Sequence, residues 1–195
     1  MHALDPDKQG AFLWQKRLGK GGVAGGVQWG SAVDAKNVYV ALSDVRMQPV
    51  PKGTSGAQDS FTGTPFALDP KAGGGLFALS LATGEIVWHT PPPGCGDKPG
   101  CSPAQSAAVT VIPGVVFSGS LDGHLRAYST DIGRIVWDVD TMMDFKTVNQ
   151  VKAHGGSLDG PGPVIVGGML YVNSGYAFVG SAPGNVLLVF SVEGK

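Results

Sequence analysis

The stretch Ala78–Trp88 reads ALSLATGEIVW, and the stretch Ala127–Trp137 reads AYSTDIGRIVW. Both place Gly six residues after Ala and Trp ten residues after it. Near the start of the chain, Ala3–Trp14 (ALDPDKQGAFLW) repeats the frame with one extra residue. A recurring strand–turn–strand unit that ends in Trp indicates a repeat architecture.

Short apolar and alternating runs bounded by turn residues surround this frame, and no segment keeps a helical period for three turns. In residues 105–139, the turns Pro113-Gly114, Asp122-Gly123 and Asp131–Gly133 separate four expected strands. Asp-Gly is a strong hairpin signal, because both residues tolerate the positive φ of a two-residue turn. Four antiparallel strands joined by tight turns make one blade of a β-propeller.

The sequence therefore predicts an all-β fold, a partial β-propeller of four-stranded antiparallel blades, as a single domain over residues 1–195. Residues 1–16 would end one blade, 29–90 and 105–139 would form two more, and 155–195 would form an incomplete last blade. The insertion 43–75, rich in Gly, Pro, Ser and Thr, is expected to be a long surface loop. Propellers close with four to eight blades, so we expect the C-terminal part of a larger ring, or a subunit that needs a partner arc.

Composition excludes several classes of protein. The 14 Lys and Arg residues nearly balance the 15 Asp and Glu residues, so nothing suggests nucleic-acid binding. A hydrophobic content of 43% can fill a core, which argues against disorder. No run of eighteen apolar residues could span a membrane, and the N-terminus does not read as a signal peptide.

The only cysteines are Cys95 and Cys101, in the loop PPPGCGDKPGCSPAQ (91–105). We predict a disulfide, because two cysteines at the ends of a tight polar loop are easily bridged; two free thiols are the alternative. Zinc-finger spacing is absent. A disulfide would indicate an oxidising compartment, either the periplasm or the cell exterior.

The tryptophans fall into two groups. Trp14, Trp88 and Trp137 lie in the repeat frame, where an indole can lie flat on the neighbouring blade while its N–H finds a backbone acceptor. We interpret these three as structural. Trp29 lies outside the frame, and it could offer its face to a planar ligand or plug the central channel.

Longer strings resemble the quinoprotein alcohol dehydrogenases, most closely the polyvinyl-alcohol-dehydrogenase-like group. The strings that carry the resemblance are GGVQWGSAVDAKNVYVALSD (25–44), AQSAAVTVIPGVVFSGSLDGHLRAY (104–128), DFKTVN (144–149), and GGMLYVNSGY with PGNVLLVF (167–190). The resemblance implies an eight-bladed ring with pyrroloquinoline quinone on its axis, a calcium ion beside the quinone, and oxidation of alcohols in the periplasm. It implies that an aspartate base accepts the alcohol proton while hydride moves to the quinone. It also implies a cytochrome c electron acceptor, and no Cys-x-x-Cys-His haem c motif occurs in this chain.

Propeller sites lie on the axis, where the innermost strands begin. The segments 28–31, 104–106 and 155–159 precede these strands, so we expect them at one end of the ring. The candidates for cofactor binding are Trp29, Gln105, Ser106, Lys146, Asn149 and Ser157. Asp144 and Asp159 are candidates for the base by position alone, and no metal ligand can be assigned. Lys146 could neutralise a quinone carboxylate or be a solvated surface lysine.

Two functions remain open. The chain would be the C-terminal part of a quinoprotein alcohol dehydrogenase, without activity alone, or a non-enzymatic propeller scaffold like those of outer-membrane assembly. Trp29, the cysteine loop and Lys146 favour the enzyme, because a scaffold has no reason to gather such groups at the axial end. The residues do not specify the alcohol, which can be small or polymeric.

Overall fold

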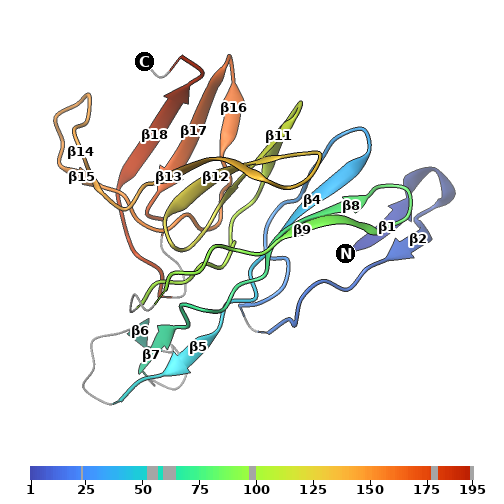
Figure 1. Cartoon of the computed structure of the whole chain (residues 1–195), viewed down its shortest axis with the longest axis horizontal. Helices are drawn as coiled ribbons and strands as arrows, with labels where there is room; N and C mark the ends of the chain where they lie inside the picture. Colours follow the sequence, from blue (N-terminus) through green and yellow to red (C-terminus); the bar gives the residue numbers. More distant parts are fainter. Residues whose placement is uncertain (23, 52–56, 59–64, 97–99, 177–179, 194–195) are drawn as a thin grey trace.

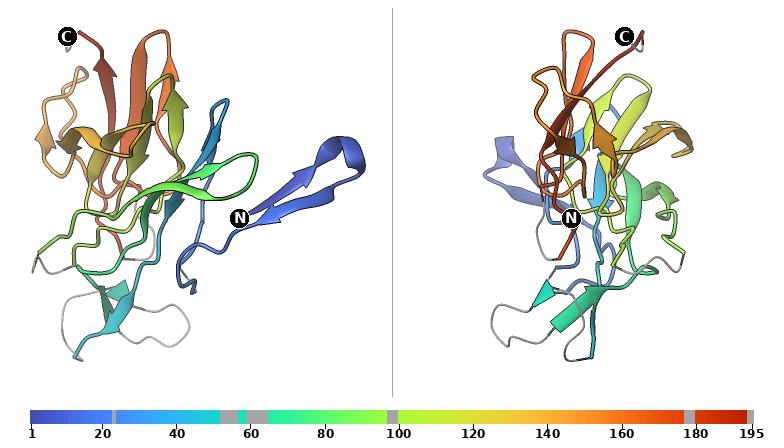
Figure 2. Two further views of the ribbon diagram at one scale, coloured as in Figure 1. Left: turned by 45° about the vertical axis from the view of Figure 1, so that its right-hand side comes forward. Right: turned by 90° about the vertical axis from the view of Figure 1, so that its left-hand side faces the viewer.

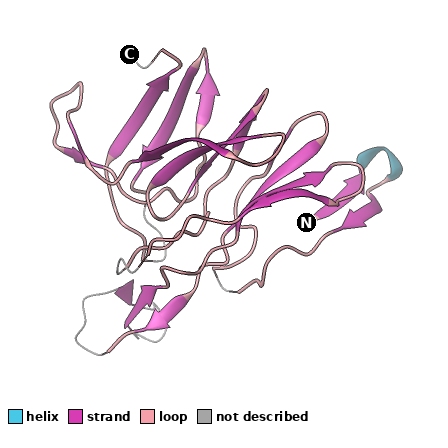
Figure 3. Cartoon of the chain, viewed as in Figure 1, coloured by secondary structure: helices cyan, strands magenta, loops and turns pink. Residues whose placement is uncertain are grey.

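The computed structural model describes residues 1–22, 24–51, 57–58, 65–96, 100–176 and 180–193 of the chain, without the side chains of 57–58. Figures 1 and 3 show an almost purely β structure, with one short 3-10 helix at Pro6–Lys8. The all-β prediction is confirmed. No helix among the described residues is long and apolar enough to cross a membrane.

Two antiparallel sheets have four strands each, in sequential order. The first blade consists of β3 (Ala32–Val33), β4 (Asn37–Leu42), β8 (Gly75–Ser80) and β9 (Ile86–Thr90). The second blade consists of β10 (Thr110–Ile112), β11 (Val115–Gly119), β12 (His124–Ser129) and β13 (Ile135–Asp140). Four sequential antiparallel strands are the propeller blade that the repeat frame predicts.

Smaller sheets lie at both ends of this arc. An N-terminal hairpin pairs β1 (His2–Asp5) with β2 (Ala11–Gln15), and it projects from the arc in Figure 2. The last blade has three strands, β16 (Val164–Val166), β17 (Met169–Ser174) and β18 (Val186–Ser191). A short hairpin, β14 (Asp144–Phe145) with β15 (Ala153–His154), connects the second blade to the last. The described chain is therefore an open arc of blades.

The insertion 43–75 is not simply a loop, so that prediction was wrong. It contains a small antiparallel sheet of β5 (Met47–Pro49), β7 (Pro65–Leu68) and β6 (Ala57–Gln58), in the order β5-β7-β6. Phe66 and Leu68, two residues apart on one face of β7, are buried against Ala104 and Leu121. This apolar alternation outweighs the Gly and Pro content of the segment.

The innermost strand of the second blade is shorter than its sequence predicts. The sequence predicts a blade from residue 105, but regular strand pairing begins only at Thr110. Ala107 instead makes an isolated parallel bridge to Gly160. The backbone of residues 106–109 therefore bonds to the blades on either side, through Gly30 and Gly160, rather than to its own blade.

The repeat tryptophans join each blade to the next. Trp14 Nε1 donates to Leu81 O in the first blade, and Trp88 Nε1 donates to Thr130 O in the second, both at 2.8 Å. Both indoles are buried. A turn glycine lies beneath each ring, Gly84 under Trp14 and Gly133 under Trp88. A Cβ on either glycine would lie 2.5 Å from Cε3 of the indole, so the position requires glycine.

Trp137 is packed differently. Its ring makes edge contacts with Phe117 and Phe190, with centroids 6.5 and 5.3 Å apart. It is only half-buried, and no acceptor for its indole N–H is found among the described residues. Trp137 therefore lacks the contact that Trp14 and Trp88 make.

Gly133→Ala tests the indole contact. Gly133 has φ +69 and lies under Trp88, whereas the control Gly114 has φ +85 and open space around its Cα. We expect Gly114→Ala to lower the free energy of unfolding by about 1–2 kcal/mol, from backbone strain alone. Gly133→Ala should cost about 1–3 kcal/mol more, because Trp88 must move. Urea unfolding measures the free energy of unfolding of both variants. An equal loss in the two would contradict the contact between Gly133 and the Trp88 ring.

Candidate functional site

Three segments that precede the first strands of the blades are joined by backbone hydrogen bonds. Val109 N donates to Gly30 O at 3.1 Å. Gly160 N donates to Ser106 O at 2.8 Å, and Ala108 N donates to Gly160 O at 2.9 Å. These bonds hold residues 28–30, 106–109 and 158–160 together at one end of the arc.

Four side chains from these segments form a cluster. Ser106 Oγ donates to Gln28 Oε1 at 2.6 Å, and the side chains of Ser106 and Trp29 lie close enough to the Asp159 carboxyl to lower its pKa. The Trp29 ring lies next to Gly160: a Cβ at this glycine would be 3.4 Å from Cζ2 of the indole. Three of the sequence candidates, Trp29, Ser106 and Asp159, are therefore brought together.

Asp159 is the most unusual group in this cluster. The residue is 4% exposed, and its Oδ1 has no hydrogen-bond partner among the described residues. Burial raises the pKa of Asp159 above its ordinary value, although hydrogen bonds from Ser106, the Gly160 N–H and Trp29 partly offset the rise. A buried carboxyl with an unused oxygen is costly to stability. Such groups gather at functional sites.

The cluster combines three chemical capacities. Asp159 holds a proton to a higher pH than an ordinary carboxyl, since burial raises its pKa. The single hydroxyl proton of Ser106 has two acceptors within reach, Gln28 Oε1 and the Asp159 carboxyl. Trp29 is 43% exposed and presents an aromatic surface beside them. A planar ligand with polar substituents is the kind of molecule that such a set can bind.

Gln105 and Ser157 lie near the cluster but turn into the protein. Gln105 Nε2 donates to Ser118 Oγ and Tyr128 OH, at 3.1 and 2.9 Å, inside the second blade. Ser157 Oγ donates to Leu121 O at 2.6 Å and accepts from Ala182 N at 2.9 Å. Both are buried. Their hydrogen bonds support the loops, and their binding to a cofactor stays a prediction.

Lys146, Asn149 and Asp144 belong to the hairpin β14–β15 and its loop. All three are exposed, and Figure 1 draws the hairpin apart from the loop between β9 and β10. Asp144 Oδ1 lies 3.0 Å from His154 Nδ1, and Asn149 Oδ1 accepts from Val151 N at 3.3 Å. The described structure does not bring these residues to Asp159, and their cofactor roles stay predictions.

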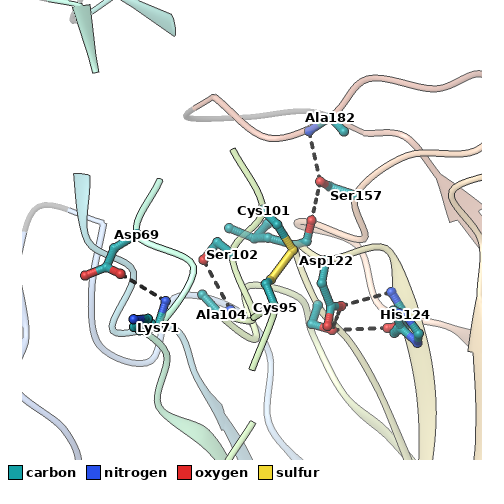
Figure 4. Close-up of a disulfide and its surroundings, with 12 residues drawn as sticks. Asp69, Lys71, Cys95, Cys101, Ser102, Ala104, Asp122, His124, Ser157 and Ala182 are labelled. Carbon is teal, nitrogen blue, oxygen red and sulfur yellow. Dashed lines mark hydrogen bonds between the residues drawn. A yellow bond between two sulfur atoms is a disulfide. The ribbon is translucent and has the colours of Figure 1, made fainter. Parts of the chain in front are cut away.

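The predicted disulfide between Cys95 and Cys101 is confirmed, with an S–S distance of 2.03 Å. Figure 4 shows it beside the Ser102–Ala104 turn, in which Ala104 N donates to Ser102 Oγ at 3.3 Å. Leu121 N in turn donates to Ala104 O at 2.9 Å. The disulfide thus closes the loop that leads directly into residues 104–106.

One residue of the cluster and one residue beside it were not predicted. Gln28 accepts from Ser106, and its place next to the out-of-frame Trp29 is the signal that could have found it. The Tyr176 ring would lie 3.4 Å from a Cβ at Gly160, and only its place in the string GGMLYVNSGY (167–176) could have pointed to it. Among the described residues, no group of three or more His, Cys, Asp or Glu side chains could hold a metal ion.

Comparison with known proteins gives the family. Residues 1–189 match the PQQ_2 model, described as outer membrane protein assembly factor BamB. The chain belongs to the PQQ_2 family. A structure of BamB from Moraxella catarrhalis is 19% identical and covers 88% of this chain and 51% of that one, with a TM-score of 0.43.

Within the PQQ_2 family, the chain is related to alcohol dehydrogenases. It is 42% identical to a polyvinylalcohol dehydrogenase of Pseudomonas sp and 39% identical to one of Sphingopyxis sp. (strain 113P3). Each match covers the whole chain but 29% of the relative. A quinone alcohol dehydrogenase subunit of Gluconacetobacter polyoxogenes is 27% identical over 52% of the chain and 14% of the relative. The resemblance to the polyvinyl-alcohol-dehydrogenase-like quinoproteins is confirmed.

Asp159→Asn should change how stability depends on pH. Because its pKa is higher when folded, the native protein binds more protons than the unfolded chain between the two pKa values, so ionisation lowers stability as pH rises. We expect the stability gain of Asp159→Asn over the natural chain to grow as the pH rises above about 4, the ordinary pKa of an aspartate, with a rise in Tm of a few degrees.

Asp144→Asn is the matched control. The exposed ion pair of Asp144 with His154 should contribute little to stability. The free energy of unfolding of Asp144→Asn should therefore differ little from that of the natural chain at each pH. Urea unfolding at several pH values measures both variants. If the free energies of unfolding of Asp159→Asn and the natural chain changed with pH in parallel, the pKa of Asp159 would not be raised.

Proposed function

We propose that this arc supplies part of the cofactor site of a quinone-dependent alcohol dehydrogenase. The observation that carries the proposal is the cluster of Trp29, Ser106 and Asp159, built from three blades at one end of the arc. Relatives named as polyvinylalcohol and quinone alcohol dehydrogenases support the same chemistry. The chain spans under a third of these relatives, so the complete site would need further residues.

The side chains fit a planar quinone that carries carbonyl and carboxylate groups. The half-exposed face of Trp29 can stack on a fused ring system. Ser106 and Gln28 supply a hydroxyl and an amide for hydrogen bonds to its oxygen atoms. Pyrroloquinoline quinone, when bound, supplies the two-electron oxidation of the alcohol carbon. In this proposal Trp29 orients the ring plane, and Ser106 with Gln28 fixes its rotation.

Asp159 is the proposed base for the alcohol proton. A general base works best when its pKa lies near the operating pH, and burial moves the pKa of Asp159 in that direction. Its Oδ1 has no partner and can accept a hydroxyl proton. The alternative candidate, Asp144, is exposed and paired with His154, so we favour Asp159.

The remaining parts of the proposal rest on the resemblance. A calcium ion beside the quinone would need six to eight oxygen ligands, most of them supplied from outside the described residues. One relative is named 1-butanol dehydrogenase (cytochrome c), and we propose a cytochrome c acceptor here. The Cys95–Cys101 disulfide supports the periplasm or cell exterior. Secondary or polymeric alcohols are the proposed substrates, from the two relatives that match the whole chain.

A non-enzymatic scaffold is the second candidate, because the family model carries the description of an assembly factor. Such a protein needs rigid blades and surfaces for partners. It would gain nothing from a buried carboxyl with an unpaired oxygen, which costs stability unless it has a role. Asp159 therefore favours the enzyme.

Titration with pyrroloquinoline quinone and calcium tests the proposal by binding, since we expect no turnover from this chain alone. We expect saturable quenching of tryptophan fluorescence and a rise in Tm, because a ligand that binds the native state stabilises it. Trp29→Ala and Asp159→Asn should each weaken binding by at least about tenfold. Lys146→Ala tests separately whether that ammonium ion binds a quinone carboxylate.

Leu13→Ala is the control, because Leu13 is exposed on the N-terminal hairpin and should not affect binding. Equilibrium dialysis gives the affinity of each variant independently of fluorescence. A folded chain without saturable binding would refute the proposal. An equal loss of affinity in Trp29→Ala and Leu13→Ala would also refute it.

A further inference from the structure

A buried ion pair lies in the second blade, outside the cluster of Trp29, Ser106 and Asp159. Arg126 of β12 lies 2.8 Å from Asp122, measured from Nη2 to Oδ2, and their side chains are only 3% and 8% exposed. Arg126 Nη1 donates to Ser120 Oγ at 2.7 Å, and Ser120 Oγ donates to Asp122 Oδ1. The ion pair therefore closes the hairpin turn between β11 and β12.

Two further groups hold the ion pair in place. Arg126 Nε donates to Asp138 Oδ2 at 3.0 Å across β12 and β13, and Asp138 Oδ1 lies 2.7 Å from His124 Nδ1. Figure 4 shows Asp122 beside His124, whose backbone N–H donates to Asp122 Oδ1 at 3.0 Å. Burial alone would lower the pKa of Arg126, but the hydrogen bond and charge of Asp122, with smaller contributions from other groups, raise it. Arg126 therefore stays charged inside the blade.

The fold of a blade does not require an ion pair at this position. Arg126 directly precedes the Ala that pairs with the Trp of its blade. Phe77 holds the same position in the first blade, where its ring stacks on His89 with centroids 3.9 Å apart. In the last blade, the register of β17 with β18 gives this position to Leu188, and both apolar side chains are buried.

Stability alone does not explain the charges of the second blade. A buried ion pair loses the solvation of both groups, so apolar side chains in its place are often as stable or more stable. Because two other blades of this chain use apolar side chains, we looked for a role in what the hairpin contacts.

The hairpin that the ion pair closes also holds two segments of the candidate site. Leu121 N donates to Ala104 O at 2.9 Å, and Leu158 N donates to Ser120 O at 3.1 Å. Ser157 Oγ donates to Leu121 O at 2.6 Å. The Ser120–Leu121 backbone therefore lies between the segment that leads to Ser106 and the segment that leads to Asp159.

These contacts form a continuous path from the ion pair to the cluster. Ser120 belongs to both, because its hydroxyl bonds to Arg126 and its carbonyl accepts from Leu158. Leu158 directly precedes Asp159, and Ala104 lies two residues before Ser106. A shift of the hairpin would thus change how Ser106 and Asp159 face each other.

We propose that Arg126 and Asp122 are positioning residues for the quinone site, because their ion pair fixes the backbone that sets Ser106 against Asp159. Neither side chain touches the ligand. The identity of the ligand rests on the proposed function, whereas the path from the ion pair to Asp159 does not. Binding groups must be held to within about 0.5 Å of their productive geometry, so a loosened hairpin should lower affinity although every binding side chain is still present.

The double variant Arg126→Leu with Asp122→Asn removes the ion pair. It introduces the apolar side chain that Leu188 supplies in the last blade, and it leaves the net charge of the chain unchanged. We expect the affinity for pyrroloquinoline quinone, measured by equilibrium dialysis with calcium, to fall at least about tenfold.

The titration of Asp159 is a second measurement, and it needs no quinone. Carboxyl ¹³C NMR follows its pKa in the natural chain and in the double variant, and Asp159→Asn identifies its signal. Burial raises this pKa, and it should fall toward its ordinary value in the double variant, because a displaced segment admits water to the carboxyl. An ion pair that served only the stability of the second blade would leave this pKa unchanged.

Phe77→Leu is the matched control, because Phe77 holds the position of Arg126 but packs in the core of the first blade. It should lower Tm and leave both the quinone affinity and the pKa of Asp159 unchanged. Arg126→Lys covers the case in which the double variant does not fold. It keeps the charge, but a lysine ammonium lacks the planar fork that binds Asp122, Asp138 and Ser120 together. We expect a smaller loss of quinone affinity than in the double variant.

Three results would overturn the proposal. The first is an unchanged quinone affinity, or an unchanged pKa of Asp159, in the folded double variant. The second is an equal change in Phe77→Leu, and the third is an Arg126→Lys variant that binds quinone as the natural chain does while the double variant fails to fold. If the natural chain itself binds no quinone, the proposed function fails, and the pKa of Asp159 alone decides whether the ion pair positions that residue.

Discussion

The indole N–H groups of Trp14 and Trp88 each donate to a backbone carbonyl of the following blade. Each contact buries a large aromatic surface and satisfies a donor that would be costly to leave unpaired. It also requires a turn glycine with positive φ beneath the ring, Gly84 or Gly133, and a bulge next to the Ala–Trp pair. Because this contact sets each blade against the next, it also brings the segments at the inner ends of the strands together.

The Ala-Gly-Trp frame was enough to predict the strand order of a blade, because the spacing between the glycine turn and the tryptophan is imposed by the contact itself. The insertion was misjudged, since its Gly and Pro content masked the alternation of Phe66 and Leu68, whose burial against Ala104 and Leu121 is tertiary. The early part of the strand before Thr110 was misjudged for a related reason. Ala107 bonds to Gly160 in the neighbouring blade, a choice that local pattern does not encode.

The sequence was enough to predict where the candidate site lies, but only some of the residues that form it. Blade topology predicts that the segments before the inner strands meet, and hydrogen bonds from Val109 to Gly30 and from Gly160 to Ser106 join them. Which side chain turns toward the site depends on single-residue alternation: Gln105 enters the second blade, whereas the adjacent Ser106 reaches Gln28. Ser157 and Asp159 differ too, although they are two residues apart: Ser157 bonds to Leu121, whereas Asp159 lies in the cluster. Lys146 became a candidate because its segment resembles the quinoprotein alcohol dehydrogenases. No contact in the described structure joins its hairpin to the cluster.

The central claim is that Trp29 contacts a bound quinone while the repeat tryptophans only hold the blades together. The indole N–H signals in a ¹H–¹⁵N NMR spectrum test this most directly, because the four tryptophans can be assigned by substitution and followed during one titration with pyrroloquinoline quinone. The account predicts a saturable shift or broadening of the Trp29 signal, with the Trp14 and Trp88 signals unchanged. A Trp29 signal that does not respond, or four signals that move alike, would contradict it.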